Sequence, residues 1–162
     1  MAQQLWLLRH GEAVPHDATS DDAARDLTDR GREQARAAGR ALTALELTFQ
    51  FVFTSPKVRA LDTAELACEA GGLGEVVVHQ PLRSGFDADE ARALLHAAGA
   101  DHRILVVGHN PDFEQVVHDL TGARIDLKKG GVAGVRMSGP ATGELVALLR
   151  PRELDRIGGG AA

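Results

Sequence analysis

Three predicted strands end in residues that could bind an anion or attack it. Arg9, His10 and Gly11 follow the first strand, and His109 follows the fourth within a Gly-His-Asn-Pro run. Arg59 lies in the first turn of the helix after the second strand. Ligands of open α/β sheets bind at the carboxyl ends of the strands, so these side chains can converge. Two guanidinium groups and two imidazoles beside helix N-termini would form a site for a doubly charged tetrahedral anion.

The elements that must position these residues alternate along the chain. Short apolar runs predict strands, and apolar residues that recur every three or four positions predict helices. The predicted strands cover residues 4–8, 51–54, 76–78, 104–107, 132–137 and 144–149. The predicted helices begin near positions 28, 55, 87 and 110, and residues 14–26 are expected to form a loop.

Capping residues indicate where these helices should begin. Thr28, Ser55, Asp87 and Asn110 each precede a helical apolar pattern, and residues of these types accept hydrogen bonds from the first N–H groups of a helix. Proline follows both Ser55 and Asn110, which is typical of the first helical position. The first helix should bury Leu45 together with the apolar positions before it.

Strands that alternate with helices predict an α/β fold with a mostly parallel central sheet. The last two strands are joined by a short Ser-Gly-Pro turn, so at least one strand should be antiparallel. A chain of 162 residues suits one domain. We expect this single domain to cover residues 1–152 as a three-layer α/β/α sandwich, and residues 153–162 to form a flexible C-terminal tail.

The composition argues against several classes of protein. A formal net charge of −5 is unlike that of a general nucleic-acid binder, which normally carries an excess of basic residues. No apolar run approaches the ~18 residues of a membrane span, and the N-terminal residues lack the pattern of a secretory signal. Cys68 is the single cysteine, so neither an internal disulfide nor a cysteine-rich zinc site can form. We therefore expect a cytoplasmic protein without nucleic-acid or membrane partners.

Several motifs, taken in order along the chain, resemble those of the histidine phosphatase superfamily, which has the phosphoglycerate-mutase-like fold. Each lies at a predicted strand end or helix start, and together they extend over most of the domain. The short chain and the Gly-His-Asn-Pro-Asp run are most similar to the SixA-type phosphohistidine phosphatases. The matching residues are Arg9-His10-Gly11, Leu27-Thr28 with Gly31, Ser55-Pro56 with Arg59, Ala60, Thr63 and Ala64, and Val107-Gly108-His109-Asn110.

This resemblance implies covalent phosphoryl transfer. His10 would attack phosphorus as a neutral imidazole, whose other ring nitrogen donates to a backbone carbonyl, and would become a phosphohistidine intermediate. Arg9, Arg59 and a cationic His109 would hold the phosphate oxygens, and Gly11 would also contact the phosphate. Water would then release inorganic phosphate. The resemblance implies neither a metal nor another cofactor.

The leaving group distinguishes the branches of this superfamily. Phosphate esters need a general acid, commonly a carboxylate on an inserted loop. Here the segment 81–87 is short, and Asp87 and Glu90 are better explained as helix caps. We therefore expect a phosphohistidine phosphatase that acts on a phosphorylated signalling or phosphotransfer protein. A small-molecule phosphomonoesterase of the same superfamily and a non-catalytic phosphate-binding module are the alternatives.

Other charged residues near these motifs allow two interpretations. Glu12 could support the site by orienting a histidine or a water molecule, or it could be a local loop carboxylate. Asp22 and Arg25 are better explained as a structural ion pair than as parts of the site. Lys128 and Lys129 could attract an acidic partner, although a solvated turn is the simpler interpretation.

Overall fold

Strands and helices alternate as expected in a computed structural model, which describes residues 2–159. This part of the chain forms six strands and five α-helices, and none of these helices is long and apolar enough to cross a membrane. The strands are β1 (Gln4–Arg9), β2 (Phe51–Thr54), β3 (Val76–Val78), β4 (Arg103–Gly108), β5 (Val132–Met137) and β6 (Gly143–Leu149). The α-helices are α1 (Asp29–Ala44), α2 (Val58–Gly71), α3 (Ala88–Ala98), α4 (Asp112–Thr121) and α5 (Pro151–Ile157). The loops contain the short 3-10 helices η1 (His16–Ala18), η2 (Asp22–Ala24) and η3 (Gln80–Leu82).

The six strands form one sheet in the order β3-β2-β4-β1-β5-β6. The first four strands in this order are parallel, whereas β5 runs antiparallel to β1 and β6 runs antiparallel to β5. The prediction of a mostly parallel sheet with at least one antiparallel strand is therefore confirmed. Because β1 and β4 are neighbours at the centre, the residues that follow them leave the sheet side by side.

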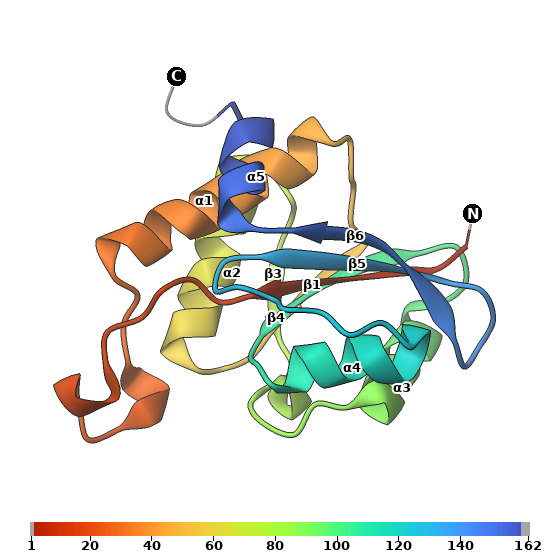
Figure 1. The fold of residues 1–162 in the computed structure, drawn as a ribbon, viewed down its shortest axis with the longest axis horizontal. Coiled ribbons are helices and arrows are strands. Elements are labelled where there is room, and N and C mark those ends of the chain that lie inside the picture. The colour runs from red at the N-terminus through yellow and green to blue at the C-terminus, as the bar shows by residue number, and fades with distance from the viewer. Residues whose placement is uncertain (1, 160–162) are drawn as a thin grey trace.

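Helices cover both faces of this sheet, as Figure 1 shows. Helices α1, α2 and α5 lie on one face, and α3 and α4 lie on the other. Successive side chains of a strand point to opposite faces of the sheet, so each central strand contributes to both layers of the core. Leu5 and Leu7 of β1 pack toward α3 and α4, whereas Trp6 and Leu8 pack toward α1, α2 and α5. The expected three-layer α/β/α sandwich is confirmed.

The expected flexible tail from residue 153 is wrong for its first residues, because they form most of α5. This helix begins with Pro151 at a first-turn position and packs on the α1 face of the sheet. Leu154 is fully buried there, and Ile157, three residues later, packs against the same core. A stripe of two apolar residues is too short to be recognised from periodicity. Residues 158 and 159 of the expected tail form a turn, and residues 160–162 lie outside the described part of the chain.

Two of the four predicted helix caps are confirmed. Thr28 caps α1 by accepting the N–H of Gly31 at 3.0 Å, and Asp87 caps α3 by accepting that of Glu90 at 2.9 Å. Ser55 and Asn110 are not caps, because α2 begins only at Val58 and the side-chain amide of Asn110 donates to Leu127 O. Leu45 follows the end of α1 and is 42% exposed, so its predicted burial is also wrong.

Candidate active site

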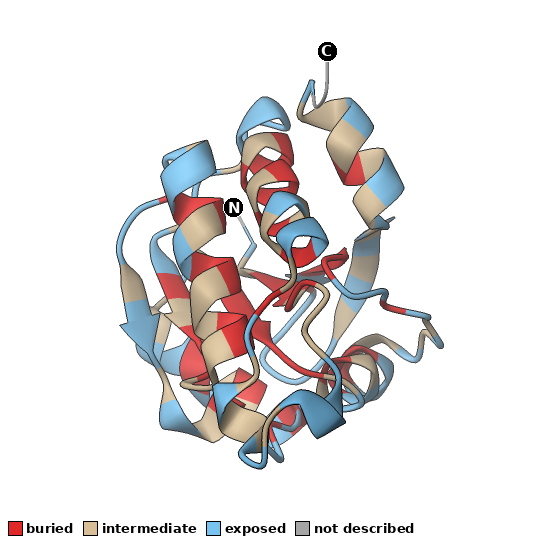
Figure 2. Cartoon of the chain, turned by 90° about the vertical axis from the view of Figure 1, so that its left-hand side faces the viewer, coloured by how far each residue is buried: buried red, intermediate tan, exposed pale blue. Residues whose placement is uncertain are grey.

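A cavity of about 840 Å³ lies at the end of the sheet where β1, β2 and β4 terminate. Figure 2 views the molecule from this side, where the loop of residues 10–28 passes in front of the sheet. The cavity lining contains the four side chains that the sequence analysis expected to converge. Its charged and imidazole side chains are Arg9, His10, Glu12, His16, Asp22, Arg25, Arg59, His109 and Lys129.

Strand register brings the two histidines together. Arg9 and Gly108 are paired across β1 and β4, so His10 and His109 each come one residue after a paired position. The N–H of His10 donates to Gly108 O at 3.0 Å, which extends the pairing by one step. As a result, the two imidazole rings lie with their centroids 5.3 Å apart at an angle of 54°.

The imidazole of His10 is fixed in one tautomer. Its Nδ1 lies 2.7 Å from Gly11 O, and because a carbonyl only accepts, Nδ1 carries the proton and Nε2 keeps its lone pair. Burial, assisted by the nearby Arg59 and Arg9, lowers the pKa of His10 to about 3, although the hydrogen bond to Gly11 opposes these effects. His10 is therefore a neutral base with a free Nε2 at neutral pH.

Gly11 holds the segment that carries His10. A Cβ atom at this position would lie 2.5 Å from Gly31 O, so only glycine allows the loop to pack on the first turn of α1. The N–H of Gly11 donates to Thr63 Oγ1 at 3.1 Å, and Thr63 Oγ1 in turn donates to Arg59 O at 2.7 Å. Because this N–H is already bonded and Gly11 does not line the cavity, its expected contact with phosphate is not supported.

Both arginines are anchored by the ends of their guanidinium groups. Arg9 Nη1 donates to Leu127 O at 2.9 Å, and Arg59 Nη1 donates to Asp22 O at 2.8 Å. The Nε atoms of Arg9 and Arg59 are buried and have no hydrogen-bond partner within the described residues. Each guanidinium is thus anchored through Nη1 on a backbone carbonyl, while its Nε is not engaged by the described chain. Burial lowers the pKa of both groups, but an arginine stays charged at neutral pH.

His109 is held by Ser55, a residue that the sequence predicts only as a helix cap. Ser55 Oγ lies 2.8 Å from His109 Nε2 and also accepts the N–H of Lys57 at 3.2 Å. If the hydroxyl donates to Nε2, the proton of His109 resides on Nδ1, which is buried and has no partner in the described chain. Ser55 directly follows β2, and His109 directly follows the neighbouring strand β4. The pairing of these two strands is the signal from which the contact could have been predicted.

The imidazole of His109 is neutral in the free protein. Burial, assisted by the nearby His10 and Arg59, lowers its pKa to about 3, whereas Asp22 acts in the opposite direction. The cationic His109 expected from the sequence is therefore not found in this state.

Asp22 joins the loop of residues 13–27 to the site. Its carboxylate pairs with Arg25 at 3.0 Å, as expected, and also with Arg59 at 3.2 Å and Lys57 at 3.3 Å. Although its partial desolvation raises the pKa, the contacts with Lys57 and Arg59 hold the pKa of Asp22 well below its usual range. Asp22 and Arg59 are far apart in sequence, and no local pattern indicated this contact.

Glu12 lies at the rim of the cavity and bonds locally. It accepts from Thr28 Oγ1 at 3.0 Å and lies 3.7 Å from the guanidinium of Arg30. Neither partner is one of the site histidines. Of the two interpretations that the sequence left open, this geometry favours a loop carboxylate that ties the segment after β1 to the start of α1.

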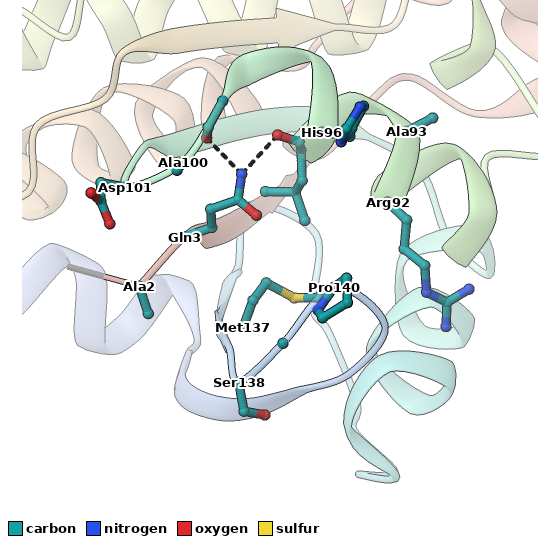
Figure 3. Close-up of a pocket in the computed structure, with 13 residues that line it drawn as sticks. Ala2, Gln3, Arg92, Ala93, His96, Ala100, Asp101, Met137, Ser138 and Pro140 are labelled. Atoms are coloured by element: carbon teal, nitrogen blue, oxygen red, sulfur yellow. Dashed lines mark hydrogen bonds between the residues drawn. The ribbon is translucent and has the colours of Figure 1, made fainter.

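A cavity of similar size, about 860 Å³, lies at the opposite end of the sheet beside α3 (Figure 3). There the side-chain amide of Gln3 donates to Leu95 O at 2.8 Å and to Gly99 O at 2.6 Å, and both bonds tie β1 to the end of α3. Arg92 is paired with Asp89. These polar groups are engaged in structural bonds, whereas the His10 cavity leaves buried donors for a ligand. Residues 2–159 include no cluster of three or more side chains suited to hold a metal ion.

Comparison with known proteins identifies the family. The model of the histidine phosphatase superfamily (branch 1) matches residues 5–84. An uncharacterized protein from Picosynechococcus sp. strain PCC 7002 is 32% identical over 139 residues, which cover 82% of this chain and 84% of that protein. Several other curated relatives, mutases and mitochondrial phosphatases among them, match over only 22–49% of their own length.

Solved structures share the whole fold. The protein histidine phosphatase SixA in complex with tungstate is 24% identical, with a TM-score of 0.83 over 93% of this chain and 99% of that chain. A protein from Nakamurella multipartitia, assigned as a SixA phosphohistidine phosphatase, is 27% identical, with a TM-score of 0.74 over 93% of this chain and 97% of that chain. Sequence and fold agree that this chain belongs to the histidine phosphatase superfamily.

Proposed function

We propose that the protein is a phosphatase that hydrolyses phosphohistidine in a protein substrate, with His10 as the nucleophile. Membership of the superfamily supports a phosphatase activity in general. One observation carries the specific proposal. The cavity lining brings His10, whose Nε2 keeps its lone pair, together with Arg9, Arg59 and His109, and each of these three has one buried side-chain nitrogen without a partner in the described chain.

In the first step, His10 Nε2 attacks phosphorus in line, and the P–N bond to the substrate histidine breaks. Arg9, Arg59 and His109 hold the equatorial oxygens, whose charge must be stabilised in the transition state. A phosphoimidazole that is protonated on its other ring nitrogen leaves as a neutral imidazole. In the second step, water attacks phosphorus, the P–Nε2 bond breaks, and His10 is regenerated as phosphate departs with the protons of that water.

The carboxylates of the cavity support a nitrogen leaving group over an alkoxide. Asp22 and Glu12 are the carboxylates in the lining. Asp22 has a pKa well below its usual range, so it is ionised at neutral pH and cannot act as an acid. Glu12 is held by Thr28 and Arg30 at the rim. An ester would need a proton donor for its alkoxide, whereas a protonated phosphohistidine brings its own proton.

The relatives support the same substrate class. The SixA structure with a TM-score of 0.83 is a protein histidine phosphatase, and its ligand, tungstate, is a tetrahedral oxyanion. An anion of this shape suits a cavity lined by two guanidinium groups and two imidazoles. On this proposal the partner is a phosphorylated signalling or phosphotransfer protein in the cytoplasm, and inorganic phosphate is the product.

The test offers three substrates to the wild type and to His10→Ala. These are a phosphohistidine polypeptide, a sugar phosphate and an activated aryl phosphate. We expect fast release from phosphohistidine, slow release from the sugar phosphate, and none by the variant. An acid-labile phosphate trapped on His10 would identify the intermediate. Preference for the sugar ester would instead indicate a small-molecule phosphomonoesterase, and binding without release would indicate a phosphate-binding module.

A further inference from the structure

A second groove, of about 480 Å³, adjoins the catalytic cavity and shares three residues with it, Arg9, Glu12 and Lys129. It runs between the start of α1, the turn before β5 and the start of α5. We call it the basic groove, because its lining holds six cationic side chains and one carboxylate. The cations are Arg9, Arg30, Lys128, Lys129, Arg150 and Arg152.

The basic groove keeps a net positive charge even when the ion pairs around it are counted. Three carboxylates, those of Glu12, Asp126 and Glu153, pair with four of its six cations. Lys129 has no ion pair within the described residues. Because the whole chain carries a net charge of −5, this positive patch is not a consequence of overall composition.

The turn that carries Lys129 is held against the backbone of Arg9 and His10. The N–H of Gly130 donates to Arg9 O at 3.0 Å and to His10 O at 2.9 Å. Gly130 has a φ of 76°, in the left-handed region that favours glycine, so the turn carrying Lys129 is closed tightly onto the backbone of His10. A substrate chain that runs from His10 into the basic groove therefore passes beside Lys129.

The exposure of the remaining cations indicates the kind of ligand. The side chains of Arg30 and Arg152 are 75% and 74% exposed, and those of Lys128 and Arg150 are 56% and 51% exposed. A second phosphate subsite would need buried, anchored donors like those of Arg9 and Arg59. Exposed cations along a groove instead complement an extended negative surface. They speed the encounter with such a partner and orient it.

Resting on the phosphohistidine phosphatase function proposed above, we infer that the basic groove docks an acidic stretch of the substrate protein that flanks its phosphohistidine. A polypeptide fits better than a single-stranded nucleic acid, because the groove lining contains no aromatic side chain on which bases could stack. The groove would then select among phosphohistidine proteins by the charge beside the modified residue.

The experiment uses two peptides with one phosphohistidine each, identical except that Asp and Glu beside it are replaced by Asn and Gln. Both compete in one reaction at low ionic strength, and the ratio of their kcat/KM values is measured. Arg152→Glu and Lys128→Glu reverse charges in the groove. Arg136→Glu is the matched control, because Arg136 is also an exposed arginine paired with a glutamate, at 3.0 Å, but lies toward the opposite end of the sheet.

We expect the wild type to prefer the acidic peptide by about fivefold or more, and the preference to shrink toward one as salt screens the charges. Arg152→Glu and Lys128→Glu should each lower the ratio about threefold or more, and Arg136→Glu should keep it. A wild-type ratio near one, or an equal loss in Arg136→Glu, would overturn the docking inference while leaving the phosphatase proposal intact.

A binding measurement separates this inference from the proposed function. Fluorescence anisotropy with the unphosphorylated acidic peptide reports docking even if neither peptide is hydrolysed. Binding that weakens in Arg152→Glu, without any hydrolysis, would support docking and refute the phosphatase proposal. Binding unchanged in Arg152→Glu would refute docking. A single-stranded oligonucleotide that binds more tightly than the acidic peptide would refute a polypeptide as the ligand.

Discussion

The two site imidazoles make the stability of the protein depend on pH in a way that can be worked out. His10 and His109 are 6% and 7% exposed, and burial is the largest cause that lowers the pKa of each from 6.5 to about 3. In the unfolded chain both imidazoles bind a proton near pH 6.5, whereas in the folded protein they stay neutral to about pH 3. Folding stability is therefore complete above pH 6.5 and falls as the pH is lowered through this window.

The size of the effect follows from linkage. Between about pH 6 and pH 4, the unfolded state holds most of one proton more than the folded state at each imidazole, and this excess, integrated over the two pH units, costs about 2 kcal/mol per imidazole and about 4 kcal/mol for both. Carboxylates also titrate in this range, so the wild type alone does not isolate the effect. The informative quantity is the difference in free energy of unfolding between the wild type and His109→Gln, measured by urea unfolding at each pH.

We expect the stability advantage of the wild type over His109→Gln to shrink by about 2 kcal/mol from pH 6 to pH 4, because the variant has no imidazole to protonate at this position. His10→Gln should behave in the same way. His96→Gln, which removes an exposed imidazole from α3, is the control for losing one titratable group. A difference that stays constant across this range for both site variants would refute the conclusion that these imidazoles are buried in their neutral form.

Three further substitutions test the geometry of the site. Arg59→Lys removes Nε and the planar fork, so kcat/KM toward phosphohistidine should fall about a hundredfold or more, with secondary structure by circular dichroism unchanged. Ser55→Ala removes the partner of His109 Nε2, so kcat should fall about tenfold or more, and the nitrogen chemical shifts of that ring should report a changed tautomer. Gly11→Ala places a Cβ 2.5 Å from Gly31 O, so the loop must shift; thermal unfolding should show a loss of about 1–3 kcal/mol, and activity should fall with it. An active Gly11→Ala variant of unchanged stability would contradict the close packing described here.

The residues at the carboxyl ends of the parallel strands could be predicted from the sequence because the patterns that mark them are local. Short apolar runs, each followed by polar residues, mark β1, β2 and β4, and the rule for parallel sheets places their ends together. The convergence of Arg9, His10, Arg59 and His109 in one cavity follows from these two facts, and the cavity has this composition. Thr28 and Asp87 were also predictable, because a cap acts only three residues along the chain.

The remaining features depend on contacts between distant segments, which no pattern in a single sequence encodes. Asp22 and Arg59 meet because the loop of residues 13–27 folds back over the start of α2. Ser55 has the composition of a cap, but the β2–β4 pairing places it against His109 instead. The short α5 is stabilised by burying Leu154 in an existing core and has too few turns to be predicted from periodicity.

The cations of the site have two effects that act together. Arg59 lies close enough to both imidazoles to lower their pKa values, so the charges that would attract a phosphoryl dianion also keep His10 unprotonated and nucleophilic. A dianion bound beside them would offset this charge and favour protonation of His109, whose Nδ1 faces no protein acceptor. We therefore expect the cationic His109 only when the site holds such a dianion. In the free protein, the same positive field favours the neutral form that the proposed nucleophile His10 requires.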